Sequence, residues 1–272
     1  MMKHLDVCMV ALATVHCAAA SIPSADRLLD RFAVNADLYQ KSFVTHVETD
    51  RVILSPAVGQ DEPQKRREQT QVVFWWNGQR MREQRYTWGD FATGTIDRAH
   101  ARYESHLFEV DKSVSYFRSG DASEEGGVTY YAGSTPKGPV FDRVTSGAGS
   151  WSWGYFVEGA GSRSDRIDRF LRACQNVRVR PEVESIDGVS CYVLEAETSN
   201  GRYTLWMDPN RGYNFVKLHF EGQGVNMIGL STAIERFGAA WVPVKAAWEV
   251  RIARPPDFSM SYRHEIRLEK LE

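Results

Sequence analysis

Two short segments combine glycine with serine, the residue types of a nucleophilic turn. They are Gly147–Ser150 and Gly159–Ser162, and neither has the G-x-S-x-G order that presents a serine nucleophile on a sharp turn. Neither has the spacing of a glycine-rich phosphate-binding loop. The sequence therefore predicts that the protein is not an enzyme and binds no cofactor.

The residue types that bind metals are scattered along the chain. Of seven histidines, His100 and His106 are the only close pair after the first twenty positions. A structural zinc site needs four ligands at tight spacing, so no metal site is predicted. Glutamates alternate with other residues at 182–184 and 195–197, which places them on the solvated face of a strand.

Cys174 and Cys191 are the two cysteines outside the first twenty residues. Export would favour a disulfide between them. The predicted strand register instead places Cys191 on a charged face, while Cys174 ends the apolar stripe of a helix expected on the opposite face. Because a disulfide brings its two Cβ atoms to within about 4.5 Å, we expect two separate thiols.

The charge balance excludes one class of partner. The 272 residues include 33 Lys and Arg against 35 Asp and Glu, a formal net charge of −2. Arginines and aromatic residues interleave at 80–88, a pattern that could stack on nucleic acid, but such binders need a basic surface. We expect no nucleic-acid partner.

The first twenty residues have the composition of an export signal. Lys3 and His4 precede the run 7–15, which is apolar except for one threonine. Ala18–Ala20 supplies the small residues that signal cleavage before Ser21 would require. These features predict a periplasmic or otherwise exported protein.

This interpretation divides the chain into a signal peptide that is removed and a domain that remains. Residues 1–20 are the signal peptide, and residues 21–272 form a single domain that is soluble after cleavage, because no later apolar run reaches the roughly 18 residues of a membrane span. A lipid anchor on Cys17 would need a small residue before it, and His16 does not fit.

The first half of the chain is predicted to begin with a helix. Ser24 is a suitable N-cap for an amphipathic helix over 24–40. A strand is expected at 41–54, followed by a polar loop over 55–70 that exposes the basic triplet Lys65–Arg67.

A second amphipathic helix is predicted at 163–174, with an apolar stripe at i, i+3, i+4 and i+7. Its arginines recur every third residue from Arg163 to Arg172. Asp165 and Asp168 stand four residues before arginines, a favourable spacing for ion pairs. A solvated face is expected, and contact with an anion or a partner is the alternative.

The rest of the chain has the turn signals of antiparallel strands. Two-residue turns are expected at Asn77-Gly78, Asp187-Gly188 and Asn200-Gly201, and a longer turn at Asp208–Gly212. Four further strands are predicted at Phe215–Phe220, Ala233–Phe237, Trp248–Ile252 and Tyr262–Leu268.

The turn signals also predict a register. The turn at 200–201 is expected to pair Ala196 with Leu205 and Leu194 with Met207. Side chains then separate onto two faces, one apolar and buried, the other charged and exposed. The apolar face is predicted to hold Val177, Val179, Val183, Tyr192, Leu194, Ala196, Tyr203, Leu205 and Met207. The charged face is predicted to hold Arg178, Arg180, Glu182, Glu184, Glu195, Glu197 and Thr204.

One stretch of these strands resembles a known family. Residues 201–213 read GRYTLWMDPNRGY and, with Ile186–Leu194 and the later Trp241-Val242-Pro243, resemble the pattern of LolA/LolB-like outer-membrane lipoprotein-sorting proteins. The resemblance implies an α+β fold, a curved antiparallel half-barrel with helices on its concave face. It also implies a cavity for acyl chains, lipid or lipidated protein as cargo, and a membrane-bound donor or acceptor.

The candidate ligand-binding residues follow from this expectation. Leu205 and Met207 would line the cavity, and the glycine-rich segment 146–161 could provide a movable cover through four aromatic residues. Those residues are Trp151, Trp153, Tyr155 and Phe156. They could equally fill the core between helix and sheet.

Two other functions remain open for this fold. An envelope-stress sensor or protein-binding module would use the same sheet without carrying a ligand. An envelope hydrolase would need a clustered acid–base pair in the cavity.

Overall fold

The structure is a computed structural model that describes residues 22–39, 43–56, 63–76, 81–88, 102–108, 112–118, 127–132, 166–174, 176–199, 201–254 and 258–271. Its elements, in chain order, are α1 (Ala25–Tyr39), β1 (Phe43–Pro56), β2 (Pro63–Trp76), β3 (Met81–Trp88), β4 (Arg102–Phe108), β5 (Lys112–Arg118), β6 (Gly127–Ala132), α3 (Ile167–Arg172), β7 (Asn176–Val179), β8 (Glu184–Ile186), β9 (Val189–Thr198), β10 (Gly201–Met207), β11 (Phe215–Gly222), β12 (Val225–Phe237), β13 (Ala240–Arg254) and β14 (Phe258–Leu271).

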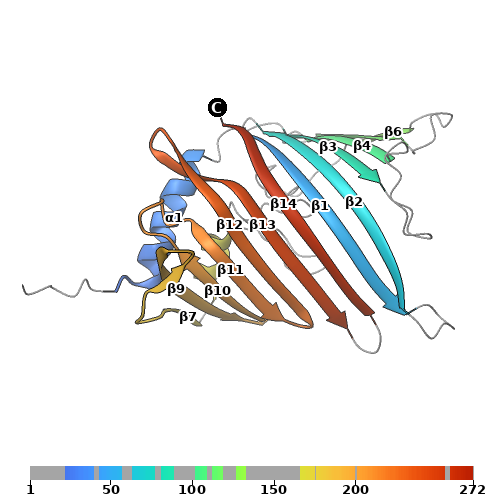
Figure 1. Cartoon of the computed structure of the whole chain (residues 1–272). Helices are drawn as coiled ribbons and strands as arrows, with labels where there is room; N and C mark the ends of the chain where they lie inside the picture. The colour runs from blue at the N-terminus through green and yellow to red at the C-terminus, as the bar shows by residue number, and fades with distance from the viewer. Residues whose placement is uncertain are drawn as a thin grey trace, which may run out of the picture.

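Within the described residues, 14 strands form one curved sheet with antiparallel pairing throughout (Figure 1). The strand order is β6-β5-β4-β3-β2-β1-β14-β13-β12-β11-β10-β9-β7, with β8 also paired to β9. The strand that follows α1 therefore pairs with the last strand of the chain. Strands β6 and β7 lie at opposite ends of this order, so the sheet is not closed.

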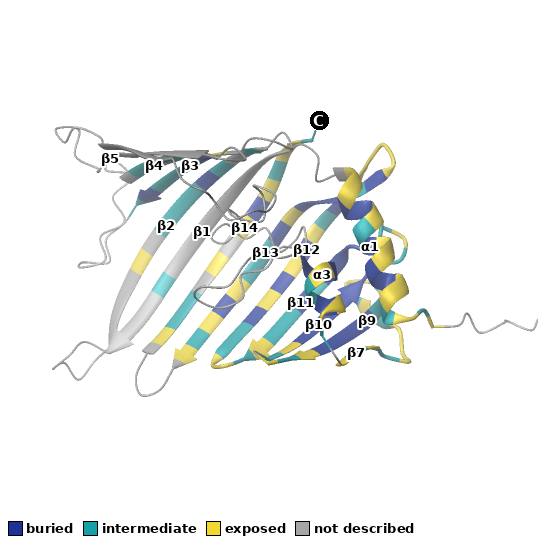
Figure 2. Ribbon diagram, turned by 180° about the vertical axis from the view of Figure 1, so that it is seen from behind, coloured by how far each residue is buried: buried dark blue, intermediate teal, exposed yellow. Residues whose placement is uncertain are grey.

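Both helices lie on one face of the sheet, which we call the inner face (Figure 2). They cover the end formed by β7 to β13, where α1 packs on β13 and β7, and the strands from β14 to β2 extend away from them. The opposite side is the outer face. Because the sheet has two sides, each strand contributes alternate residues to the inner and outer faces.

Helix α1 forms as its sequence predicts. The backbone N–H of Arg27 donates to Ser24 Oγ at 3.3 Å, which confirms the N-cap. Its apolar stripe packs into the main core, where the Phe32 ring stacks on Phe215 with centroids 5.3 Å apart. The buried residues of this stripe are Leu28, Leu29, Phe32 and Ala36.

The two faces of β9 and β10 are separated as predicted, although the strand pairing differs. Leu194 pairs with Leu205 and Ala196 with Tyr203, because the hairpin closes Thr198 on Gly201. The expected register was wrong by two residues. A two-residue shift leaves every side chain on its face, so Leu194, Ala196, Leu205 and Met207 are buried as expected.

The turn at Asp187-Gly188 is confirmed. Ile186 pairs with Val189, and the two turn residues have φ angles of +49° and +81°. These positive values are the conformation that Asp and Gly tolerate in a two-residue hairpin. In the longer turn, Gly212 has φ +67°. The turn at Asn77-Gly78 lies outside the described residues.

Several sequence predictions were wrong. The expected loop over 55–70 is largely strand, since Lys65, Arg66 and Arg67 pair in β2 with β1. Val183 is 54% exposed, because the chain leaves the sheet between β7 and β8. The four predicted strands after position 214 are confirmed but are longer.

The second helix is shorter than predicted. Helix α3 has six residues, and the predicted Arg163 and Asp165 lie outside the described residues. Arg166 precedes the helix and is 4% exposed. It therefore does not belong to a solvated face, because α1 and α3 enclose it between two aspartates.

Candidate functional site: the inner face of the sheet

The inner face carries an apolar surface, the apolar floor, that runs from β9 to β2. Its members come from strands far apart in sequence and form one core cluster with the helices. On the strands, the buried members of the apolar floor are Val72, Leu194, Ala196, Tyr203, Leu205, Met207, Phe215, Leu218, Met227, Ala240, Val242, Ala246, Val250 and Ile266.

Helix α1 is fixed to one end of the floor by a pair of hydrogen bonds. Asn35 Nδ2 donates to the carbonyl of Trp241 at 2.8 Å, and the N–H of Trp241 donates to Asn35 Oδ1 at 2.8 Å. Gly212 lies so close that a Cβ there would be 2.4 Å from Asn35 Cγ. This contact and the positive φ of Gly212 leave room only for glycine. The asparagine therefore sets the position of α1 on the sheet.

Helix α3 is joined to α1 by ion pairs. Arg166 Nε donates to Asp168 Oδ1 at 2.6 Å, and its Nη1 donates to Asp37 on α1. Burial opposes the charge of this guanidinium, but the hydrogen bonds to the two aspartates outweigh it and raise the pKa of Arg166. Arg172 adds a more exposed bond to Asp30 at 2.7 Å.

The apolar floor continues beyond these helices. Val250 on β13, Ile266 on β14 and Val72 on β2 are each 3% exposed. Trp248 and Ile252 on β13 are half-buried and pack against the same cluster. A floor of this kind contacts hydrocarbon without directional bonds, which suits an acyl chain.

At β3 the inner face becomes polar. Glu83 is 4% exposed and lies 2.8 Å from Arg85 Nη2. Thr70 on β2 and Thr87 on β3 form the next cross-strand pair on this face, and their hydroxyls lie 3.5 Å apart. The apolar floor therefore ends at buried charged and hydroxyl groups.

Small side chains form one part of the apolar floor. Ser231 on β12 pairs with Ala246 on β13, and Gly229 precedes Ser231 on the same face, opposite Trp248. Ser231 is 7% exposed, and its Oγ has no hydrogen-bond partner within the described part of the chain. A buried hydroxyl without a partner costs about 1–3 kcal/mol, so this position is not explained by packing alone.

The structure brings only some of the predicted site residues together. Leu205 and Met207 are 0% and 1% exposed and lie in the apolar floor below the helices. The four aromatic candidates, Trp151, Trp153, Tyr155 and Phe156, lie outside the described residues. Sequence reasoning missed Trp248 and Ser231. The alternation of Met227, Gly229 and Ser231 along β12 is a signal for them, because it places all three on the inner face.

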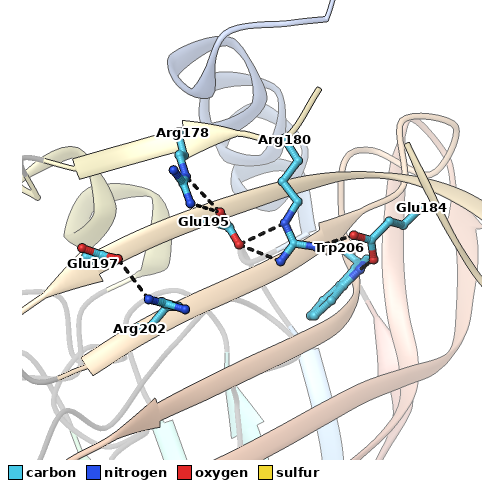
Figure 3. Close-up of polar contacts among 7 residues, drawn as sticks. All are labelled: Arg178, Arg180, Glu184, Glu195, Glu197, Arg202 and Trp206. Atoms are coloured by element: carbon cyan, nitrogen blue, oxygen red, sulfur yellow. Dashed lines mark hydrogen bonds and ion pairs between the residues drawn. The ribbon is translucent and has the colours of Figure 1, made fainter. Parts of the chain in front are cut away.

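A cluster of charged residues lies on the outer face at the β7 edge (Figure 3). Arg178 and Arg180 each donate from Nε to Glu195 at 2.9 Å. Glu195 was expected to be exposed but is 9% exposed, because the β7 segment covers it with two arginines. The hydrogen bonds from Arg180, opposed by burial, lower the pKa of Glu195.

The same cluster extends to β8 and β11. Glu184 pairs with Arg180 and accepts a hydrogen bond from Trp206 Nε1 at 2.7 Å, which is the largest cause of its lowered pKa. Lys217 Nζ lies 4.6 Å from the Trp206 ring centroid. Glu184 and Glu195 therefore bond to arginine and tryptophan side chains, and these bonds hold the β7–β8 edge on the sheet.

Under this charged cluster lies a second apolar cluster, formed by Cys191, Val193, Trp206, Val216 and Ile234. The prediction of an exposed outer face was therefore wrong at this edge. Cys191 and Cys174 are separate thiols, as predicted. Burial raises the pKa of Cys191 to about 12, so this thiol stays protonated.

The described residues contain no group of three or more His, Cys, Asp or Glu side chains that could hold a metal ion. None of the helices described has the length and apolar character of a bilayer span.

A comparison with solved structures finds three chains that match this one. The crystal structure of LprF from Mycobacterium bovis aligns over 91% of this chain and 94% of that chain, with 10% sequence identity and a TM-score of 0.30. A TM-score of 0.30 is too low to relate the two proteins in fold or function. No family model and no curated protein matches the sequence.

Proposed function

We propose that the protein binds the acyl chain of a lipid or a lipidated protein on the inner face of the sheet. The observation that supports this is the continuation of the apolar floor past α1 and α3, from Trp248 and Val250 to Val72. Burial of an acyl chain provides about 0.8 kcal/mol per CH₂, enough for useful affinity from non-directional contacts.

The polar end of the floor limits where the acyl chain can lie. The inner face changes from apolar residues to Glu83, Arg85 and Thr87 along one direction. In this proposal the acyl chain lies along the apolar floor and ends before β3.

The proposal includes export and exchange with a membrane. The composition of residues 1–20 supports export, and the 201–213 motif supports a LolA-like half-barrel with helices on the concave side. A carrier role would require a membrane-bound donor or acceptor. Release from such a carrier needs an opening step, because the gross burial energy of a long chain is large.

The first experiment is a lipid extraction. The protein, purified without detergent from an exporting host, is treated with organic solvent, and the extract is analysed by mass spectrometry. We expect the extract to contain acylated molecules in a molar amount close to that of the protein. An extract without lipid, together with no binding of added palmitate by calorimetry, would contradict the proposal.

A matched pair of variants localises the binding. Ile252→Asn places an amide on the apolar floor, and Arg251→Asn changes its exposed neighbour on the same strand. We expect Ile252→Asn to weaken palmitate binding roughly tenfold, because it removes apolar contact area, and Arg251→Asn to leave it unchanged. Equal effects would place the ligand elsewhere.

A further inference from the structure

Ser231 is a polar group in an otherwise apolar part of the inner face. Its cross-strand partner is Ala246, and the next residues on its own face are Gly229 and Met227. Only 7% of Ser231 is exposed, and within the described residues its Oγ neither donates nor accepts a hydrogen bond. Burial without a partner is uncommon for a native hydroxyl.

The neighbours of this hydroxyl supply little side-chain volume. Gly229, on the same strand as Ser231, has no side chain, and Ala246, the cross-strand partner on β13, has one methyl group. The large residues around them, Leu218 and Trp248, both pair with Gly229. The side chains directly beside the hydroxyl without a partner are therefore small.

We propose that the Ser231 hydroxyl donates a hydrogen bond to the carbonyl oxygen of the ligand's acyl ester or amide. This rests on the proposed function and narrows its ligand class, from any hydrocarbon to an acylated molecule whose carbonyl lies over β12. The hydrogen bond gives specificity, because a buried donor that is satisfied only by the correct ligand rejects analogues without the acceptor.

A second buried polar atom without a hydrogen-bond partner, Asn214 Oδ1, is not a candidate for binding the ligand's carbonyl oxygen. Asn214 Oδ1 is buried in the turn that precedes β11, and the same side chain donates from Nδ2 to the carbonyls of Arg211 and Trp241. That residue belongs to the attachment of α1. An amide oxygen also only accepts hydrogen bonds, so it could not bind a carbonyl.

The test compares two ligands that differ in one carbonyl group. Palmitoyl lysophosphatidylcholine and its hexadecyl ether counterpart are titrated separately, below their micelle concentrations, into delipidated full-length protein and followed by calorimetry. We expect the wild-type protein to bind the ester about fivefold more tightly than the ether, the range for one hydrogen bond.

The variant Ser231→Ala removes the donor, and Thr232→Ala removes an exposed hydroxyl from the next position as a control. We expect Ser231→Ala to bind both ligands with affinities within about twofold, near that of the wild type for the ether. Thr232→Ala should keep the ester preference.

Thermal unfolding without ligand gives an independent readout. A hydroxyl without a partner destabilises the empty protein, so Ser231→Ala should raise Tm by about 2 °C while it removes the ester preference. A hydroxyl that bonds within the protein would instead make the same variant less stable. A fall in Tm would therefore overturn the inference.

The remaining outcomes separate the two proposals. Equal affinity of the wild-type protein for ester and ether would overturn the role of Ser231 and leave acyl-chain binding intact. A preference that survives in Ser231→Ala would do the same. Binding of neither ligand would overturn both proposals.

Discussion

The two ends of the sheet bury opposite kinds of residue on the inner face. At the end covered by α1 and α3, Leu194, Leu205 and Leu218 are fully buried on this face. At β3 the same face buries Glu83 and Thr87 instead.

The outer face also differs between the two ends. At the helix-covered end the ion pairs of Glu195 lie over the buried cluster of Cys191, Val193 and Trp206. At β2 to β4 the outer face carries half-buried aromatic rings: Tyr86 lies 4.9 Å from Tyr103 and 6.1 Å from Trp88 between ring centroids. Arg82 lies 5.3 Å from the Trp75 ring, and Gln84 donates to the Tyr103 hydroxyl at 2.8 Å.

This difference follows from what each end packs against. A sheet face must be apolar where an amphipathic helix packs on it, and α1 packs on β13, β7 and α3. The helix-covered end is therefore a finished core. The continuation of the floor from β14 to β2 lies beyond the strands that α1 packs on, which is why we propose the ligand there.

The largest effect is expected from the ion pair that joins the helices. Arg166→Met leaves the carboxylate of Asp168, 3% exposed, without its bidentate partner, and should lower the free energy of unfolding by about 3–5 kcal/mol. Arg172→Met is the control, because its bond to Asp30 is largely exposed and should contribute under about 1 kcal/mol. Urea unfolding measures both. Similar losses would mean that burial of the pair does not matter.

A second prediction compares the cores of the two ends directly. Leu205→Ala leaves a cavity at the helix-covered end and should cost roughly 3 kcal/mol. Tyr86→Ala removes half-buried ring contacts at the other end and should cost about 1 kcal/mol. Urea unfolding of both variants would contradict the comparison if Tyr86→Ala were the more damaging substitution.

The sequence predicted the helix-covered end well, for local reasons. The N-cap at Ser24 and the alternation along β9 and β10 each depend on neighbouring residues. The hairpin register was wrong because Thr198 Oγ1 accepts from the N–H of Gly201 at 3.2 Å, which closes the turn one residue pair earlier. The face of each side chain was unaffected by that two-residue shift.

Features that depend on distant segments could not be predicted in this way. The strand character of Lys65–Arg67 comes from pairing with β1, and the burial of Glu195 comes from β7. The alternation along β12 places Ser231 on the inner face, but the absence of a hydrogen-bond partner depends on which strands lie beside β12. The candidate site therefore depends on pairing between strands that are far apart in the sequence, which local patterns do not predict.

The smallest effect is expected on the outer face, where two glutamates of one strand differ in burial. The side chain of Glu195 is 12% exposed and bonds to two arginines, whereas that of Glu197 is 59% exposed and lies 3.2 Å from Arg202. The sequence placed Glu195 on an exposed face, where a substitution would have little effect, but its burial predicts a measurable loss of stability. Glu195→Gln should lower the free energy of unfolding by roughly 1 kcal/mol at neutral pH, and Glu197→Gln by less than about 0.5 kcal/mol.

The lowered pKa of Glu195 determines how the effect of Glu195→Gln on stability changes with pH. The pKa of Glu195 in the folded protein is lowered from 4.5, so its contribution is complete above the pKa of the unfolded chain and is lost as pH falls through the folded value. The difference between wild type and Glu195→Gln should therefore shrink below about pH 4 in urea unfolding. The Glu197→Gln curve should run parallel to that of the wild type. If both variants gave parallel curves, the ion pairs of Glu195 would add no stability, and the outer face would be equally solvated along the whole strand.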